Sequence, residues 1–310
     1  MTKGINPNAP LSLRAFFMKF AARMIMRPAL HEPKLAAKRA RVEKLARFTF
    51  IAAGTTFTPG TLGGVPVEWV AHPQAGARGF VLYLHGGAYA VGSPRTHRAL
   101  TSRLAQMARV CVAAVDYRLA PEHPHPAAVD DALAAYRGLL AQDIPANKII
   151  IAGDSAGGGL ALATALRLKA EPLPQPAGIV CLSPWVDLTL AGESMKSRVK
   201  NDVMLSPALL AEAAAMYLGK QSGLTATASP LFGNLTGLAP LFIQVGGQEI
   251  LHDDATRLAQ AASAQGVPVT LQTWPNLWHV WQLHGGTMPE ADAAIAAMAN
   301  FVHGCLTGRM

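Results

Sequence analysis

Short runs of β-branched and other apolar residues alternate with longer Ala/Leu-rich stretches through most of the chain. The clearest runs lie at residues 79–84, 109–115, 148–152, 240–247 and 267–274. Each run has the length of a buried strand, and the helical patterns between the runs can supply crossover connections. From residue 80 onward the pattern predicts an α/β fold, with a mostly parallel central sheet flanked by helices on both faces.

One predicted strand-to-helix junction carries a motif with chemical meaning. Residues 153–157 (GDSAG) directly follow the run 148–152 and precede an Ala/Leu-rich helix that continues to Lys169. A strand that leads straight into a helix strains the backbone at Ser155, and small neighbours let the strand and the helix approach each other. Ser155 is therefore the candidate nucleophile, and the Ala156 amide at the helix N-terminus can stabilise an oxyanion. By itself, G-x-S-x-G also fits an ordinary glycine-rich turn.

A glycine-rich loop after an earlier strand is the second feature. Residues 85–89 (HGGAY) follow the apolar run 79–84. Glycine amides without neighbouring side chains can point at a ligand, so Gly86 and Gly87 are candidates for an oxyanion hole together with Ala156. The alternative interpretation of these residues is an ordinary turn.

Two candidate partners for Ser155 lie downstream. Glu249 and His279 each come shortly after a predicted strand. The order serine, carboxylate, histidine is that of α/β-hydrolases, in which the histidine is the base and the carboxylate orients it. We expect a triad of Ser155, Glu249 and His279, with Asp253 as the alternative acid.

These motifs together resemble those of the hormone-sensitive-lipase-like (bacterial family IV) esterases. The resemblance covers about residues 66–305 and rests on residues 85–89, 116–122 (DYRLAPE), 153–158 and 249–254. It implies an α/β-hydrolase with a helical cap and a serine carboxylesterase that hydrolyses short- to medium-chain acyl esters through an acyl-enzyme. It also implies that no metal and no other cofactor takes part. A lactone or amide hydrolase on the same triad and a non-catalytic small-molecule receptor are the alternatives.

Two residues depart from the family pattern, and two others are given supporting roles by the resemblance. Ala88 stands where many members have a third glycine, and Glu249 stands where aspartate is more frequent. The stretch 116–122 would support the oxyanion loop through hydrogen bonds and an ion pair of Arg118. Asp154 would brace the turn that carries Ser155.

Composition is consistent with a globular enzyme and excludes several other classes. The chain has 310 residues, of which 51% are hydrophobic and 15% charged, as in globular proteins and unlike disordered or fibrous chains. Its three cysteines are too scattered for a disulfide framework or a zinc site. Because Arg14, Lys19 and Arg23 interrupt the apolar stretches near the N-terminus, we expect no signal peptide and no transmembrane segment, and hence a cytoplasmic enzyme.

Positive charge is concentrated at the N-terminus. Residues 1–50 carry eleven basic and two acidic residues, a net charge of +9, and the other 260 residues carry −1. The apolar residues of this segment fall near helical spacing: Leu13, Phe16, Phe17, Phe20, Met24 and Ile25. We expect them to pack over the active site as part of a cap, with a membrane-surface or nucleic-acid role as the alternative.

The expected organisation is N-terminal cap helices in residues 1–50 and a catalytic domain in 51–310 with a cap insertion near 190–223. Six methionines fall in the two cap segments, where they would form an adaptable apolar wall or simply pack helices: Met18, Met24, Met26, Met195, Met204 and Met216. The expected partner is a small-molecule ester. We expect no nucleic acid and no stable membrane insertion, and the sequence allows a homodimer.

Overall fold

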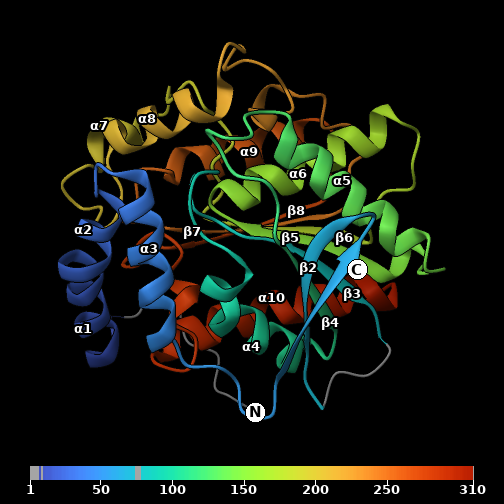
Figure 1. The fold of residues 1–310 in the computed structure, drawn as a ribbon, viewed down its shortest axis with the longest axis horizontal. Coiled ribbons are helices and arrows are strands. Elements are labelled where there is room, and N and C mark those ends of the chain that lie inside the picture. Colours follow the sequence, from blue (N-terminus) through green and yellow to red (C-terminus); the bar gives the residue numbers. More distant parts are fainter. Residues whose placement is uncertain (1–6, 8–9, 74–77, 310) are drawn as a thin grey trace.

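A single eight-stranded sheet forms the centre of the protein in this computed structural model, which describes residues 7, 10–73 and 78–309 (Figure 1). The strand order is β1-β2-β4-β3-β5-β6-β7-β8; β2 runs antiparallel to β1 and to β4, and the other neighbours are parallel. The strands are β1 (Thr56–Leu62), β2 (Val65–Ala71), β3 (Phe80–Leu84), β4 (Cys111–Val115), β5 (Ile149–Asp154), β6 (Gly178–Leu182), β7 (Leu241–Gly246) and β8 (Val269–Trp274). The predicted fold class is confirmed. The β1–β2 hairpin at the edge was not predicted.

Helices cover both faces of this sheet. In Figure 1, α4 and α10 lie on one side, and α5, α6 and α9 lie on the other. The α-helices are α1 (Leu13–Ala21), α2 (Arg27–Leu30), α3 (Leu35–Leu45), α4 (Arg98–Ala108), α5 (Ala127–Leu140), α6 (Ala156–Ala170), α7 (Ser194–Ser197), α8 (Pro207–Leu218), α9 (His252–Ala264) and α10 (Pro289–Thr307). A π-helical turn, Ala22–Met26, joins α1 to α2. Short 3-10 helices span Ala46–Phe48, Pro94–His97, Ala146–Lys148, Pro230–Phe232 and Trp281–His284.

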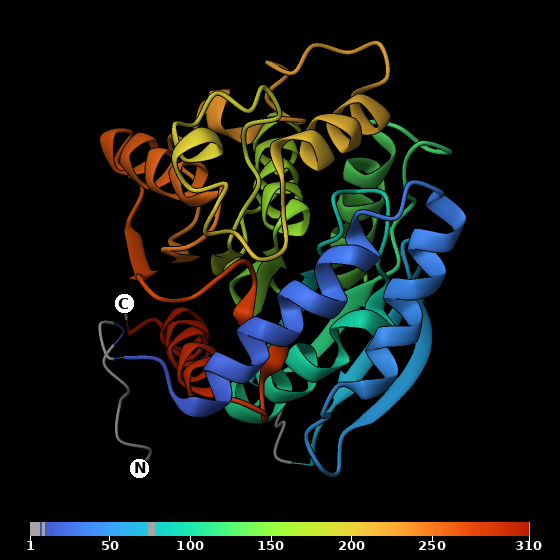
Figure 2. The ribbon, with the colours of Figure 1, turned by 90° about the vertical axis from the view of Figure 1, so that its left-hand side faces the viewer.

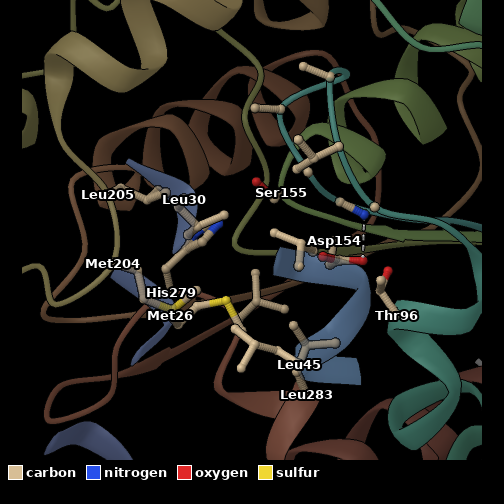
Figure 3. Close-up of a pocket in the computed structure, with 18 of the residues that line it drawn as sticks. Met26, Leu30, Leu45, Thr96, Asp154, Ser155, Met204, Leu205, His279 and Leu283 are labelled. Atoms are coloured by element: carbon tan, nitrogen blue, oxygen red, sulfur yellow. Dashed lines mark hydrogen bonds between the residues drawn. The ribbon is translucent and has the colours of Figure 1, made fainter. Parts of the chain in front are cut away.

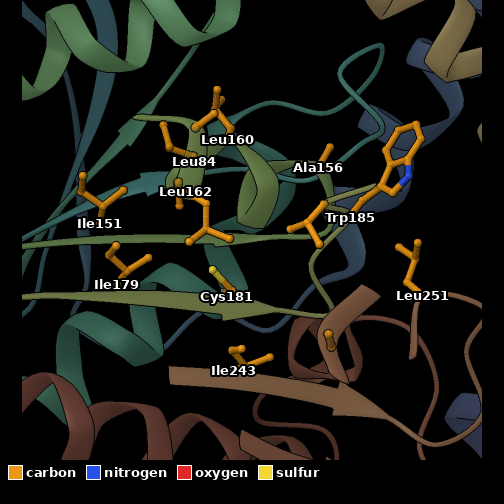
Figure 4. Packing of buried hydrophobic residues seen from close by; sticks show 14 of the residues in the cluster. Leu84, Ile151, Ala156, Leu160, Leu162, Ile179, Cys181, Trp185, Ile243 and Leu251 are labelled. Atoms are coloured by element: carbon orange, nitrogen blue, oxygen red, sulfur yellow. The ribbon is translucent and has the colours of Figure 1, made fainter. Parts of the chain in front are cut away.

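Alternation along the central strands creates two apolar layers. Ile149 and Ile151 of β5 face the layer under α5, α6 and α9, whereas Ile150 faces the layer over α4 and α10. Successive side chains of a strand point to opposite faces, so a continuous apolar run suits a strand that is covered on both sides. Figure 4 shows the first layer, in which Leu162 of α6 packs among residues of neighbouring strands.

The strand register brings the motif-bearing loops to one edge of the sheet. Leu84 at the end of β3 pairs with Gly153 near the end of β5, and Gly246 at the end of β7 pairs with Trp274 at the end of β8. The loop after each of these four strands carries one of the predicted site segments. The carboxyl edge of a parallel sheet is where such folds place their sites.

The two segments expected to form a cap lie side by side. Figure 2 shows α1, the π-helical turn and α2 crossing in front of the sheet edge, below α7 and α8. Arg27 donates a hydrogen bond of 2.7 Å to the Asp202 carbonyl, and His31 Nε2 lies 3.0 Å from Ser206 Oγ. These contacts join the N-terminal helices to the segment 190–223. Residues 1–6 and 8–9 of the expected N-terminal segment lie outside the described residues.

The orientation of the first helix differs from the expectation. Phe16, Phe17 and Phe20 are 60–61% exposed, and Leu13, Met24 and Ile25 are 54–72% exposed, so the expectation that these six residues pack over the site is wrong. The buried positions are Ala15 in this helix and Ala22 in the π-helical turn that follows it. Alanines allow the helix backbone to approach the protein closely, which turns the larger side chains outward. Apolar spacing locates a stripe on a helix, but it does not say whether that stripe faces the protein.

Among the described residues, no helix is both long enough and apolar enough to cross a membrane.

Candidate active site

Ser155 lies on a sharp turn between β5 and α6. Its backbone has φ 54° and ψ −123°, in a region that residues other than glycine rarely adopt. The turn also requires a close approach at Gly157, because a Cβ there would lie 2.0 Å from the Leu84 carbonyl oxygen. Strain of this kind is held in place by the surrounding fold and is typical of functional sites. The sequence-predicted strand-turn-helix geometry is therefore present around Ser155.

His279 and Glu249 form a buried pair beside this turn. His279 Nδ1 lies 2.6 Å from Glu249 Oε2. Burial by itself lowers the pKa of His279, but the charge and hydrogen bond of Glu249, helped by the charge of Asp202, outweigh it and raise the pKa above its usual 6.5. Because Nδ1 faces the carboxylate, Nε2 is the nitrogen left to exchange a proton with a substrate-side group. Ser155 and His279 both line the same pocket (Figure 3).

No hydrogen bond joins Ser155 Oγ to His279 in the described part of the chain. Such contacts are often long in the free enzyme and shorten when a substrate binds.

Asp253, the alternative acid, is placed elsewhere. Its Oδ2 accepts a hydrogen bond of 2.9 Å from the Ser194 amide, and its Oδ1 lies 3.3 Å from His252 Nδ1. Of the two candidate carboxylates, the geometry thus brings Glu249 to His279. Asp253 instead attaches the segment 190–223 to the start of α9.

Ser183 and Asp202 support the pair, and sequence reasoning missed both. Ser183, directly after β6, donates a hydrogen bond of 2.7 Å to Glu249 Oε1 and accepts one of 3.1 Å from the Val280 amide. Asp202 accepts a 2.9 Å hydrogen bond from the Ile250 amide, and burial raises its pKa. A signal for Ser183 existed in the sequence, since it directly follows the apolar run 178–182 that forms β6. Nothing in the pattern around Asp202 pointed to the site.

The amides around the expected oxyanion hole differ in availability. The Gly86 amide donates a hydrogen bond of 3.0 Å to Asp154 Oδ1, which is at odds with the expectation that it is free for an oxyanion. The amides of Gly87, Ala88 and Ala156 donate to no acceptor among the described residues. Gly87 has φ 123° and Ala88 φ 54°, so the loop turns through left-handed conformations here. A left-handed conformation favours glycine, so Ala88 is held in a conformation that is unfavourable for a residue with a side chain.

Asp154 holds the oxyanion loop against the nucleophile turn. Besides the Gly86 amide, its Oδ1 accepts a 2.7 Å hydrogen bond from the Tyr83 hydroxyl, and its Oδ2 lies 3.3 Å from His97 Nε2. Burial alone raises the pKa of Asp154, but the charge of His97 and the hydrogen bonds from His97 and Tyr83 outweigh it, so the pKa is lowered. An ionised carboxylate next to Ser155 is thus used as a structural brace.

The stretch 116–122 supports the oxyanion loop through hydrogen bonds, as expected, but not through Arg118. The Tyr117 hydroxyl donates a hydrogen bond of 2.6 Å to the His85 carbonyl, and the two rings stack at 4.3 Å. Arg118 pairs with Asp131 on α5 and so does not contact the oxyanion loop. Glu122 instead pairs with Arg39 of α3.

The pocket that contains Ser155 is a cavity of about 160 Å³ with mainly apolar walls. Its walls come from α2, α3, α8 and the loops at the sheet edge (Figure 3). Three of the six methionines proposed for an acyl wall line it: Met26, Met204 and Met216. Met24 is exposed, and Met18 and Met195 pack in the apolar layers without lining the pocket. Within the described ranges, no group of three or more metal-ligating side chains is assembled.

Comparison with known proteins agrees with this geometry. The family profile for the α/β hydrolase fold matches residues 81–283. The chain belongs to the α/β-hydrolase family, in its hormone-sensitive-lipase-like branch. An acetyl-hydrolase of Streptomyces hygroscopicus is 46% identical over 78% of this chain and 81% of its own length. An esterase of Acinetobacter venetianus is 42% identical over 78% and 80%, respectively. A solved esterase of the bacterial hormone-sensitive lipase family superposes with a TM-score of 0.91 and 38% identity, covering 96% of this chain and all of its own.

Proposed function

We propose that this α/β-hydrolase is a serine carboxylesterase for short- to medium-chain acyl esters. The observation that carries the proposal is one pocket that contains both the strained Ser155 and the His279 ring, with Glu249 2.6 Å behind the ring. The names of the relatives, acetyl-hydrolase and esterase, support the same reaction class.

The proposed reaction follows from the placement of these groups. His279 removes the proton of the Ser155 hydroxyl as the oxygen attacks the ester carbonyl, and Glu249 stabilises the imidazolium that forms. The amides of Gly87, Ala88 and Ala156 receive the oxyanion, whereas the Gly86 amide keeps Asp154 in place. His279 then protonates the leaving alcohol, and a water molecule hydrolyses the acyl-enzyme through the same histidine.

Pocket size supports the proposed acyl range. A cavity of about 150 Å³ holds a molecule of the size of benzene, so about 160 Å³ suits roughly four to six acyl carbons. We propose that the segments 1–50 and 190–223 act as a cap, because Met26, Met204 and Met216 from these segments line the cavity.

The three cysteines are free thiols, which is typical of proteins in a reducing compartment. We therefore propose that the enzyme acts in the cytoplasm, which cell fractionation would test.

Hydrolysis of p-nitrophenyl butyrate tests the proposed reaction. Ser155→Ala should lower kcat by on the order of 10⁶-fold, because the reaction loses its nucleophile. Ser197→Ala is a matched control, since the hydroxyl of this serine donates a hydrogen bond to the Glu193 carbonyl of its own helical turn and Ser197 does not line the described pocket. A Ser155→Ala variant as active as the parent would contradict the assignment. Binding of the ester without turnover by the parent would instead indicate a receptor.

A further inference from the structure

The first helix presents an apolar stripe to solvent. We use this name for Leu13, Phe16, Phe17, Phe20, Met24 and Ile25, whose exposed fractions are 54–72%. Four of these residues follow the spacing i, i+3, i+4 and i+7 along α1, which places them on one face, and the π-helical turn continues the stripe. A soluble protein seldom leaves so many large apolar side chains together in water, so the stripe is expected to have a partner.

Cations flank this stripe. On a helix of 3.6 residues per turn, Arg14 lies on one side of the phenylalanines and Lys19 on the other, with Arg23 one turn further along the same side. No carboxylate pairs with these three residues among the described side chains. Burial is the larger cause that lowers the pKa of Lys19, and repulsion from Arg23 is the smaller one. The repulsion agrees with a cluster of positive charge that no described carboxylate neutralises.

We propose that the apolar stripe and its flanking cations dock this protein on an anionic lipid surface. Exposed aromatic residues between basic residues are what a helix needs to lie in the plane of a membrane interface. The helix would rest within the headgroup region, which needs no membrane-spanning segment.

Charge argues against a second copy of this chain as the partner. A two-fold interface brings the same patch of both subunits together. The flanking cations Arg14, Lys19 and Arg23 of both copies would then face each other, and like charges at an interface are unfavourable. Phosphate groups of lipids offer the opposite charge, and acyl chains accept the phenylalanines.

Docking would bring the catalytic pocket close to the lipid. Ala22, Met26 and Leu30 line the pocket from the inner side of the same helical segment. A helix with its side chains is about 10–12 Å across, so the pocket would lie about one helix diameter from the membrane surface. Apolar esters dissolved in the membrane would then reach the pocket over a short path. The docking itself does not depend on the esterase assignment.

Vesicle co-sedimentation tests the proposal with the full chain. The parent protein is mixed with vesicles of phosphatidylcholine alone, or of phosphatidylcholine and phosphatidylglycerol, at low and at high ionic strength. The stripe variant is Phe16→Ser/Phe17→Ser/Phe20→Ser, and its matched control replaces three exposed apolar residues elsewhere, Leu224→Ser/Phe232→Ser/Leu271→Ser. Circular dichroism melts and hydrolysis of p-nitrophenyl butyrate show that each variant is folded.

The charge test uses a second pair of variants. Arg14→Glu/Lys19→Glu/Arg23→Glu reverses the flanking cations, and Lys200→Glu/Lys220→Glu changes two exposed lysines away from the stripe. Sedimentation velocity without lipid measures the oligomeric state of the parent and of the stripe variant.

The parent should bind phosphatidylglycerol vesicles, and salt should weaken this binding. The partition coefficient into phosphatidylglycerol vesicles should fall by at least about 100-fold in the stripe variant and in the charge variant. Both controls should bind as the parent does. The proposal is overturned if the parent does not bind these vesicles at low salt, or if either test variant binds as the parent does. A stripe-dependent dimer in the absence of lipid would also overturn it, in favour of a second copy.

Discussion

At the scale of single residues, the site depends on which carboxylate contacts the His279 ring. Glu249 lies 2.6 Å from His279 and is held on its other oxygen by Ser183 and by the Gly246 amide. Two residues therefore fix a carboxylate that in turn fixes the imidazole. The roles proposed for these residues can be separated by substitution.

Replacing the triad acid gives the first test at this scale. Glu249→Gln should lower kcat by roughly 10⁴-fold, because an amide favours the wrong histidine tautomer and does not stabilise the imidazolium. Asp253→Asn is the matched control, since Asp253 contacts Ser194 and His252 and not His279. Steady-state kinetics with p-nitrophenyl butyrate would measure both variants. A silent Glu249→Gln with a crippling Asp253→Asn would reverse the assignment.

The pH profile is a second test. The pKa of His279 is raised above 6.5. As the pH drops through this raised value, the imidazole becomes protonated and cannot act as the base, so kcat/KM should fall. In Glu249→Gln the acid limb should move to lower pH, since burial then lowers the pKa of His279 against only the smaller effects of the Asp202 and Asp154 charges. The same raised pKa stabilises the folded protein below about pH 6.5, and this contribution is lost as the pH rises through the folded value. An acid limb that stays in place in Glu249→Gln would contradict this assignment.

Sequence reasoning succeeded at residues whose chemistry is tied to a motif. Ser155, Glu249 and His279 each follow a recognisable strand, so their approach at one sheet edge was foreseeable. The engagement of the Gly86 amide was not foreseeable, because its acceptor is the Asp154 side chain at the end of β5, a strand distant in sequence. Likewise, Asp202 lies in an irregular segment whose path no periodicity describes.

At the scale of elements, one arginine fastens α3 to the loops around the site. Arg39 donates two hydrogen bonds of 2.7 Å to Glu122, one of 2.8 Å to the Ala90 carbonyl and one of 2.9 Å to the Ala120 carbonyl. Hydrogen bonding to Arg39 lowers the pKa of Glu122 to about 2. Since α3 also lines the pocket, the position of this helix should affect substrate binding.

Arg39→Met should therefore loosen α3. We expect faster amide exchange over residues 35–45 and a raised KM, with a cost to the local stability of roughly 1–2 kcal/mol because the contacts are partly exposed. Arg41→Met is the control, because the ion pair of Arg41 is with Glu32, which lies in the same N-terminal segment. Hydrogen exchange by mass spectrometry would compare the two variants. Equal protection of α3 in both would show that Arg39 does not anchor it.

At the scale of the whole molecule, we propose that the apolar cavity between the segments 1–50 and 190–223 and the sheet edge sets the acyl range. The parent should hydrolyse esters of about four to six acyl carbons fastest, and the rate should fall for longer chains as the cavity overfills. Met204→Ala should shift the optimum to longer chains, because Met204 lines the cavity.

Met195→Ala is the matched control for this shift, since Met195 is buried in the same segment but does not line the cavity. Each substitution removes a buried side chain and should cost about 2–5 kcal/mol of stability, so the ratio of rates between chain lengths is the informative quantity. A p-nitrophenyl ester series would measure it. An unchanged ratio in Met204→Ala would place the acyl chain elsewhere.

The buried pair behind the nucleophile also makes catalysis a reporter of folding. Glu249 and His279 are 30 residues apart, and Ser183, which holds them, lies 66 residues before Glu249. Contacts between such distant parts of a chain form late, because loop closure costs entropy before the contacts compensate for it. Enzyme activity during refolding should therefore return only when the carboxyl ends of the strands have come together. Most of the helical circular dichroism signal should return before that. An enzyme assay would then follow completion of the native state more faithfully than a measurement of helix content.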